Sequence, residues 1–331
     1  MSCQLVGADA AAEFLKENND FVILTHANPD GDTIGSGYAL NAVLKAMGKR
    51  SGVLCGDPIP PKLRFLESDE PINFKPQTVV AVDIADERLL GGLKEQFEGK
   101  IDLCIDHHGS NMKYAKMLYL EADSASCCEC VYEVIKSLGA VVTPFVASAL
   151  YLGMATDTGC FKFSGTTPRT HRFAAELMEL GADFDAINRA MFETKSKSRI
   201  ELERQVLDGI EFICDGRCAV VTVTREMIES MGCEQTDLDS VSSLAREIEG
   251  VKIGVTVKEQ SSGTFKVSIR TYEPYDASEI CKTFGGGGHK RAAGCEFKIP
   301  LAEVKSALFE TISGVLNSEV TPVNLKFKEK I

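Results

Sequence analysis

Two short apolar runs in the first third of the chain each end in a cluster of residue types that bind metal ions. The run 21–24 leads into the cluster 26–32, and the run 101–105 leads directly into the cluster 106–108, Asp-His-His. The chain has five histidines, and three of them lie in these two clusters. Because parallel strands of α/β proteins collect functional groups at their carboxyl ends, this placement predicts two buried strands that end at one site.

The first half of the chain alternates strand-like and helix-like segments. We expect strands at 21–26, 52–55, 78–83 and 101–105, and a helix from about Thr33 to Met47. From 125 to about 208 the apolar pattern becomes helical. This order is typical of an α/β fold, with a mostly parallel sheet flanked by helices.

The residues beyond 208 have a different pattern, which predicts a second, smaller α+β domain. Strands are expected at 219–224, 251–258, 264–271 and near 295–299, helices near 236–248 and 276–283, and a frayed tail from about Thr321. The charged stretch 191–208 carries few apolar side chains on any face, which favours a connecting helix or linker. The expected domains are therefore 1–190 and 209–331, joined by 191–208.

The composition argues against several classes of protein. A formal net charge of −12 disfavours a protein that coats long nucleic acids, since such binding depends on clustered Lys and Arg. No apolar stretch reaches the roughly 18 residues that span a bilayer, and the first residues lack a basic region followed by an apolar core. Several of the twelve cysteines lie inside apolar patterns, which favours reduced thiols. We therefore expect a cytoplasmic protein without membrane association.

Four segments offer ligands for metal ions. His26, Asp30 and Asp32 are separated by Pro29 and Gly31, which turn the chain so that alternate side chains can converge. The other candidates follow other apolar runs: Asp83, Asp86, Asp106, His107, His108 and Asp157. This mixture of carboxylates and imidazoles exceeds what one ion needs and suits paired Mn²⁺ or Mg²⁺ better than Zn²⁺. Paired ions of this kind favour phosphoester hydrolysis.

Each motif taken alone also has a purely structural interpretation. The cluster 26–32 could be a turn that caps the following helix, and an isolated run of four glycines could be a flexible loop. The sequence Cys127-Cys128-Glu-Cys130 has CxxC spacing, but no partner pair stands at a suitable distance. We expect these thiols to lie at the start of a helix rather than to bind zinc.

Taken together, the motifs resemble those of a known superfamily. His26-x-Asn-Pro-Asp30-Gly-Asp32, Asp83, Asp106-His107-His108 and Asp157-Thr-Gly are similar, in order and spacing, to four successive motifs of the DHH phosphoesterases. The segment 284–294, Phe-Gly-Gly-Gly-Gly-His-Lys-Arg-Ala-Ala-Gly, resembles the glycine-rich motif of the DHHA1 domain. The resemblance therefore spans nearly the whole chain.

The resemblance implies a role for each motif residue. His26 and Asp30 would hold one metal ion, and Asp32, His107 and Asp157 would hold the other. Asp83 would bridge both ions, His108 would face the scissile phosphate, and Asp106 would orient an imidazole. The implied catalytic residues are thus His108, Asp83 and Asp106, and the implied substrate-binding residues are His108, Arg270, Gly286, Gly287, Gly288 and His289. The metal centre is expected to face a cleft closed by the second domain.

Within the superfamily, the compact DHH–DHHA1 arrangement is similar to the NrnA type of nano-RNase and pAp phosphatase. This implies two divalent cations, Mn²⁺ first and Mg²⁺ second, and short oligonucleotides or 3′-phosphoadenosine 5′-phosphate as substrates, with nucleoside 5′-monophosphates released from the oligonucleotides. A homodimer is compatible with it, and long duplexes are not expected partners. The alternatives are a soluble cyclic or linear dinucleotide phosphodiesterase, a RecJ-like single-strand exonuclease and, from another class, a nucleotide sensor without turnover.

Overall fold

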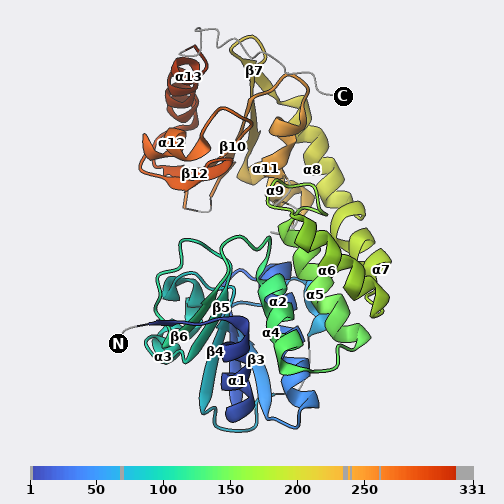
Figure 1. The fold of residues 1–331 in the computed structure, drawn as a ribbon. Helices are drawn as coiled ribbons and strands as arrows, with labels where there is room; N and C mark the ends of the chain where they lie inside the picture. The colour runs from blue at the N-terminus through green and yellow to red at the C-terminus, as the bar shows by residue number, and fades with distance from the viewer. Residues whose placement is uncertain (1–2, 68–70, 234–237, 239–240, 261, 318–331) are drawn as a thin grey trace, which may run out of the picture. The chain divides into compact units, whose positions relative to one another are not determined.

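A computed structural model describes residues 3–67, 71–233, 238, 241–260 and 262–317 of the chain. It contains two compact units, Met1–Thr194 and Lys195–Ile331, each built around its own six-stranded sheet (Figure 1). The expected fold class is confirmed, with a parallel sheet flanked by helices in the first unit and a smaller α+β unit after it. Among the residues described, no helix is both long and apolar enough to cross a bilayer.

The sheet of the first unit has the strand order β1-β6-β5-β4-β2-β3, and every neighbouring pair is parallel. Its strands are β1 (Gln4–Leu5), β2 (Phe21–Thr25), β3 (Ser51–Cys55), β4 (Thr78–Val82), β5 (Leu103–Asp106) and β6 (Met117–Leu120). The three central strands β2, β4 and β5 therefore end at the same edge, which is where the polar clusters follow them.

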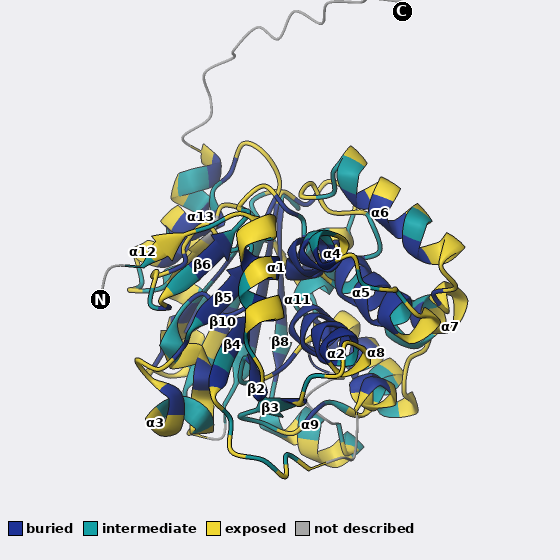
Figure 2. Ribbon diagram, turned by 60° about the horizontal axis from the view of Figure 1, so that its bottom comes forward, coloured by how far each residue is buried: buried dark blue, intermediate teal, exposed yellow. Residues whose placement is uncertain are grey.

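Both faces of this sheet are buried, which explains why its strands are continuous apolar runs rather than alternating ones. Phe21 and Ile23 of β2 pack into one core with helices on that face, whereas Val22 and Leu24 pack into a second core on the opposite face. Figure 2 shows the central strands in the colour of buried residues.

Helices and short helical turns complete the first unit. The α-helices are α1 (Ala8–Glu17), α2 (Gly31–Ala46), α3 (Lys94–Phe97), α4 (Cys127–Leu138), α5 (Pro144–Asp157), α6 (Pro168–Glu179) and α7 (Phe184–Asn188). The 3-10 turns η1 (Pro61–Leu66) and η2 (Glu87–Leu93) and the π-helical turn η3 (Arg189–Glu193) lie between them. Helix α2 begins two residues before the predicted start at Thr33, because Asp30 caps it.

Helices α2 and α5 pack closely along each other, and small residues make this approach feasible. A Cβ atom on Gly35 of α2 would lie 2.3 Å from the carbonyl oxygen of Ala149 in α5, which is closer than real Cβ atoms come. Both helices are buried nearly all round, as expected of helices inside a core. The pair therefore forms a rigid support beside the sheet.

The second unit has the strand order β11-β12-β10-β9-β8-β7. All its neighbouring strands are antiparallel except β8 and β9. Its strands are β7 (Glu211–Ile213), β8 (Cys218–Val223), β9 (Ile253–Glu259), β10 (Phe265–Thr271), β11 (Gly287–His289) and β12 (Ala292–Phe297). Its described helices are α8 (Lys197–Asp208), α9 (Arg225–Met231), α11 (Val241–Leu244), α12 (Ala277–Lys282) and α13 (Leu301–Asn317), with the 3-10 turn η4 (Ala245–Glu247).

The stretch that we expected to connect the domains contributes to the second unit. Helix α8 buries Leu202 and Val206 in the same apolar cluster as Val221 of β8. The division between the compact units falls at Thr194 and Lys195. The domain limits 1–190 and 209–331 remain a prediction.

Two other expectations fall partly or wholly outside the described residues. Of the expected helix 236–248, residues 236, 237, 239 and 240 are not described, and 241–247 form α11 and η4. The expected tail from Thr321 also lies outside the described part of the chain.

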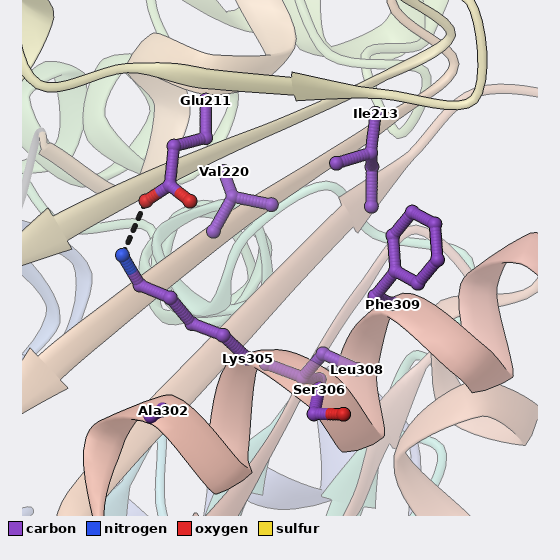
Figure 3. Close-up of a pocket in the computed structure, with 8 residues that line it drawn as sticks. All are labelled: Glu211, Ile213, Val220, Ala302, Lys305, Ser306, Leu308 and Phe309. Atoms are coloured by element: carbon purple, nitrogen blue, oxygen red, sulfur yellow. Dashed lines mark hydrogen bonds and ion pairs between the residues drawn. The ribbon is translucent and has the colours of Figure 1, made fainter.

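A pocket of about 300 Å³ lies in the second unit, between β7, β8 and α13 (Figure 3). Its lining includes Val220, Leu308 and Phe309, and the ion pair between Glu211 and Lys305 closes one side. No predicted site residue lines this pocket, so it plays no part in the site described below.

Candidate metal centre

The start of α2 brings two predicted carboxylates together. Asp30 is the N-cap of this helix, and its Oδ1 accepts hydrogen bonds from the backbone N–H groups of Asp32 (3.0 Å) and Thr33 (3.1 Å). A Cβ atom on Gly31 would lie 2.4 Å from Oγ1 of Thr156, so this turn packs directly against the end of α5. The capping interpretation of the cluster is therefore correct, and it is compatible with a site.

His26 follows β2 and points its ring at two carboxylates. Its Nδ1 lies 2.8 Å from the carbonyl oxygen of Ala27, which can only accept a hydrogen bond, so the neutral ring keeps its lone pair on Nε2. Nε2 lies 3.6 Å from Oδ1 of Asp30 and 3.5 Å from Oδ2 of Asp83. These distances suit ligands gathered around one ion.

Asp83 occupies the centre of the cluster. It follows β4 with a positive φ of 59°, an uncommon conformation for a residue with a side chain, and only 3% of its side chain is exposed. Its Oδ1 lies 3.6 Å from Nε2 of His107 and 3.5 Å from Nδ1 of His108. This Oδ1 is buried without a hydrogen-bond partner, which is costly unless another group satisfies it.

Asp106, the first residue of the Asp-His-His motif, uses both carboxylate oxygens to hold the loop after β5. Its Oδ1 accepts hydrogen bonds from the backbone N–H of His107 (2.8 Å) and from Nδ1 of His108 (2.8 Å). Its Oδ2 accepts a hydrogen bond from the side-chain amide of Asn111 (2.7 Å). Asp106 therefore orients the His108 ring and has little capacity left for an ion.

His107 is oriented by the loop that leads into α4. Its Nδ1 lies 3.1 Å from the carbonyl oxygen of Ser124, so the neutral ring keeps its lone pair on Nε2. Nε2 lies 3.5 Å from Oδ2 of Asp157 and 3.8 Å from Oδ2 of Asp32. The end of α5, the start of α2 and the end of β5 thus contribute one side chain each to this part of the cluster.

The N-terminus of α4 fixes Asp32. The backbone N–H groups of Cys127 and Cys128 donate to its two carboxylate oxygens at 2.6 and 2.9 Å. A Cβ atom on Gly153 would lie 2.7 Å from Oδ1 of Asp32 and 2.2 Å from Sγ of Cys128, so only glycine fits at this position of α5.

The three cysteines at the start of α4 serve the scaffold, as their position at a helix start suggested. Cys127, Cys128 and Cys130 are fully buried, and burial raises the pKa of each thiol. The Cys127 thiol donates to the carbonyl oxygen of Ile105 (3.2 Å) and the Cys130 thiol to the hydroxyl of Ser124 (3.5 Å). Neutral, hydrogen-bonded thiols of this kind are poor metal ligands.

Among the described residues, three groups of side chains could each hold a metal ion, because within each group the ligand atoms lie within 4.8 Å of one another. These groups are His26, Asp30 and Asp83; Asp32, His107 and Asp157; and Asp83, His107 and His108. All six predicted metal ligands and His108 thus lie together. Asp86 is separate, because it caps η2 and bonds to the exposed Arg88.

The electrostatics of the cluster show an excess of buried negative charge. Burial, together with the neighbouring Asp30, raises the pKa of Asp32 to about 7, and burial together with Asp32 raises the pKa of Asp157 to about 7. Burial and the charge of Asp32 raise the pKa of Asp83 well above its usual value. Divalent cations would supply the missing positive charge, so the donor set fits such ions.

The pKa values of the two imidazoles in contact with these carboxylates are also raised, which favours the charged form of each ring. Burial opposes the charged form of His26, but hydrogen bonds and charges of Asp30 and Asp83 outweigh it and raise its pKa to about 11. The hydrogen bond to Asp106 raises the pKa of His108 to about 9, against the effect of burial.

Sequence reasoning missed a supporting network behind His107. Arg169, at the start of α6, donates from Nε to the fully buried Glu129 (3.0 Å) and from Nη2 to the hydroxyl of Ser124. Ser124 is also the residue whose carbonyl oxygen accepts from His107. The sequence feature that could have indicated this network is Glu129, a charged residue between the apolar residues that begin α4.

The remaining predicted residues lie in the second unit. Arg270 is half-buried in β10, and Gly287–His289 form strand β11, so the glycine run is not an unstructured loop. A Cβ atom on Gly286 would lie 2.2 Å from the carbonyl oxygen of Gly294, and Gly288 has a φ of 142°, so both positions require glycine. The side chain of His289 is not described, and its role remains a prediction.

Comparisons with known proteins agree with both units. Residues 20–154 match the DHH family, N-terminal domain, and residues 215–318 match the DHHA1 domain. A Thermus thermophilus protein named "Bifunctional oligoribonuclease and PAP phosphatase NrnA" is 36% identical over 295 residues, which cover 87% of each chain.

Solved structures share the fold. An exopolyphosphatase-related protein from Bacteroides fragilis superposes with a TM-score of 0.85 at 22% identity, covering 94% of this chain and 97% of that one. RecJ from Thermus thermophilus in complex with Mn²⁺ gives a TM-score of 0.57 at 15% identity, covering 94% of this chain and 55% of RecJ. With both domains matched in order and a relative this similar along nearly its whole length, the chain belongs to the DHH family, as a protein in which a DHH domain is followed by a DHHA1 domain.

Proposed function

We propose that this protein is a divalent-metal-dependent phosphoesterase that hydrolyses short oligonucleotides and 3′-phosphoadenosine 5′-phosphate. The observation that carries the proposal is the convergence of three other carboxylates and three imidazoles around Asp83. The name of the Thermus relative, which is similar over 87% of both chains, supports the substrate class.

The residues fall into two ligand sets. His26 and Asp30 would hold one ion, Asp32, His107 and Asp157 would hold the second, and Asp83 would contact both. The partnerless Oδ1 of Asp83 and the raised pKa values of its neighbours support this assignment. Oxygen-rich sets of this kind suit Mn²⁺ or Mg²⁺, and RecJ, which has the same fold, has been solved with Mn²⁺.

Two bound ions would activate water and stabilise charge on the leaving oxygen. The protein groups beside them have separate tasks. In the metal-free chain the hydrogen bond to Asp106 raises the pKa of His108 to about 9, and in its protonated form the imidazole can donate a hydrogen bond to a phosphate oxygen. Asp106 keeps that ring in place, since it accepts a hydrogen bond from Nδ1 at 2.8 Å.

The acidic character of the chain supports short substrates. A net charge of −12 disfavours the extended basic track that long strands need. The twelve cysteines, all free, suit a reducing compartment, so we place the enzyme in the cytoplasm.

Asp83→Asn is expected to lower turnover about 1000-fold, because loss of a ligand common to both ions removes several kcal/mol of transition-state stabilisation. The measurement is kcat on 3′-phosphoadenosine 5′-phosphate with Mn²⁺. Asp86→Asn makes the same change on a half-buried carboxylate outside the cluster and should leave kcat near the wild-type value. Near-full activity of Asp83→Asn would contradict the central role of this residue.

Without bound metal, the protein should become less stable as the pH rises from 5 to 8. In the folded metal-free chain, Asp32 and Asp157 have pKa values of about 7, above the 3.8 of an unperturbed Asp, so between pH 5 and 8 the folded state binds more protons than the unfolded state. The free energy of unfolding then falls as pH rises through this window. The raised pKa values of His26 and His108 add to this trend above pH 6.5.

Thermal melting in chelator between pH 5 and 8 measures this effect. The melting temperature should fall with pH, and Mn²⁺ should restore it most at pH 8. A double variant, Asp32→Asn with Asp157→Asn, removes two of the titrating carboxylates and should make the dependence shallower, leaving the contribution of His26 and His108. A melting temperature that rises with pH in chelator would refute the interpretation of the cluster.

The rate should fall steeply with substrate length. A panel of 5′-labelled single strands from two to about 24 nucleotides tests this, because an acidic chain offers long strands no additional contacts. Degradation of the longest strands at undiminished rate would favour the RecJ-like alternative, and hydrolysis confined to dinucleotides would favour a dinucleotide phosphodiesterase. Metal-dependent nucleotide binding without hydrolysis of any substrate would indicate a sensor.

Arg169→Met is expected to weaken Mn²⁺ binding about 10- to 100-fold, the usual cost of losing a group that orients a metal ligand. The reason is that Ser124, released from Arg169, would no longer hold the His107 ring. Calorimetric titration with Mn²⁺ measures the affinity independently of turnover. Arg172→Met, on the same helix but exposed, is the control. Equal Mn²⁺ affinities for both variants would show that the network serves stability alone.

A further inference from the structure

The peptide unit that follows Asp83 is held by side chains as well as by its neighbours in the core. The backbone carbonyl oxygen of Ile84 accepts hydrogen bonds from the hydroxyl of Tyr114 (2.6 Å), from Nδ2 of Asn111 (3.3 Å) and from the thiol of Cys104 (3.7 Å). Ile84 is itself fully buried in the apolar core on one face of the sheet. Several donors that converge on one carbonyl oxygen fix the orientation of its peptide.

These donors belong to β5 and to the loop that follows the Asp-His-His motif. Cys104 lies in β5, and Asn111 and Tyr114 lie in the loop between β5 and β6. The backbone N–H of Met112, in the same loop, donates to the carbonyl oxygen of Ala85 (2.9 Å). The loop is therefore bonded to two successive carbonyl groups of the segment after β4, which ties together two segments that carry predicted metal ligands.

The direction of the shortest of these bonds is defined. A carbonyl oxygen can only accept, so the single hydroxyl proton of Tyr114 points at Ile84. The Sγ atom of Cys104 lies 3.3 Å from the same hydroxyl, whose oxygen can still accept from the thiol. Burial raises the pKa of Tyr114 well above its usual value, so the phenol keeps its proton at neutral pH.

Asn111 connects this peptide to the Asp-His-His motif. Its Nδ2 lies 2.7 Å from Oδ2 of Asp106 and 3.3 Å from the carbonyl oxygen of Ile84, and the two N–H groups of one amide can serve both acceptors. Its Oδ1 accepts a hydrogen bond from the backbone N–H of Lys113 (2.7 Å), which fixes the amide in this orientation. The side chain therefore bridges the two segments.

The backbone conformation of Asp83 explains what such a clamp does. Its φ of 59° is unfavourable for a residue with a Cβ atom, and such conformations persist only where the surrounding structure holds them. The backbone N–H of Asp83 donates to the carbonyl oxygen of Ile105 in β5 (3.0 Å), which holds the residue on one side. The bonds from Tyr114 and Asn111 hold the next peptide on the other side.

We propose that Tyr114 is a positioning residue of the metal centre. With Asn111, it holds the peptide of Ile84 so that Asp83 keeps its left-handed conformation and presents its carboxylate to both ions. The inference rests on the proposed function, since it takes Asp83 as the ligand common to both ions. Tyr114 acts through the backbone, so we expect an effect at the lower end of the range known for groups that orient metal ligands, about tenfold in affinity.

The test is Tyr114→Phe, which removes the hydroxyl and keeps a ring that packs against the core. Calorimetric titration of the chelator-treated full chain with Mn²⁺ should show both ion sites weakened about tenfold, because Asp83 would contact both ions. Wild-type affinity at both sites would overturn the inference. Weakening confined to one site would also overturn it, since the effect would then concern a ligand of a single ion.

A magnetic measurement gives a readout that a loss of stability alone does not change. Two Mn²⁺ ions that share a carboxylate couple magnetically, which broadens their electron paramagnetic resonance spectrum. The loaded wild-type protein should show this broadened spectrum. At the same loading, Tyr114→Phe should show a larger share of the resolved lines of isolated Mn²⁺. A spectrum identical to that of the wild type would overturn the inference.

Tyr132→Phe is the matched control. Tyr132 is a buried tyrosine of the same unit, and its hydroxyl donates to Glu176 of α6 (3.0 Å) rather than to a segment of the site. Its loss should lower the melting temperature and leave both Mn²⁺ affinities at the wild-type values. An equal loss of Mn²⁺ affinity in Tyr132→Phe and Tyr114→Phe would show a general effect of lost stability and would overturn the inference.

If Tyr114→Phe does not fold, as judged by thermal melting, Asn111→Ala decides, because it removes another donor to the same carbonyl oxygen. Its bond to Asp106 concerns the His108 ring, which belongs to neither proposed ligand set. Weakening of both Mn²⁺ sites in this variant would support the inference, and wild-type affinities would overturn it.

Failure of the proposed function would appear separately, as a wild-type protein that binds Mn²⁺ at both sites but hydrolyses neither short oligonucleotides nor 3′-phosphoadenosine 5′-phosphate. The Mn²⁺ titration of Tyr114→Phe then still decides the inference, by the outcomes given above. A wild-type protein that binds no Mn²⁺ would overturn both, since there would be no metal centre to position.

Discussion

The buried carboxylate of Asp83 is the group on which the rest of the site depends. One oxygen lies between two imidazoles, at 3.6 and 3.5 Å, and the other lies 3.5 Å from His26. A carboxylate with 3% of its side chain exposed needs compensating charge, and burial with the charge of Asp32 already raises its pKa. The site therefore combines an electrostatic cost in the metal-free chain with a strong preference for cations.

The scaffold around the cluster explains how such a cost is tolerated. Asp32 accepts two backbone hydrogen bonds at the N-terminus of α4, and Asp30 accepts two at the start of α2. Glycines at positions 31 and 153 allow α2, α4 and α5 to meet without side chains between them. Asp30 and Asp32 are thus held by helix N-termini, whose partial positive charge partly offsets the repulsion among the acids.

Positive charge in the first unit supports the orientation of a candidate ligand. Arg169 is neutralised by Glu129, and it contacts Ser124, whose carbonyl oxygen lies 3.1 Å from the His107 ring. An arginine that is paired in this way stabilises the geometry around it.

The sequence by itself determined the fold class and the membership of the cluster. Continuous apolar runs predict strands buried on both faces, and residue types at the ends of strands and of one helix, from His26 to Asp157, identify candidate ligand atoms. These features are local, because strand burial and metal affinity depend on residue type and on order along the chain. The glycine run was also recognisable from the sequence, although its pairing as strand β11 was not.

Only the tertiary structure decided how these groups divide their work. Asp106 and Asp83 are both buried carboxylates at strand ends, yet hydrogen bonds occupy Asp106 while Asp83 keeps a free oxygen. The cysteines at the start of α4 contribute backbone N–H groups to Asp32 rather than thiolates. Arg169 carries no motif, because its role depends on a contact with Glu129, 40 residues away along the chain. Long-range packing of this kind fixes which polar atoms remain unsatisfied, and that distinction cannot be read from residue type alone.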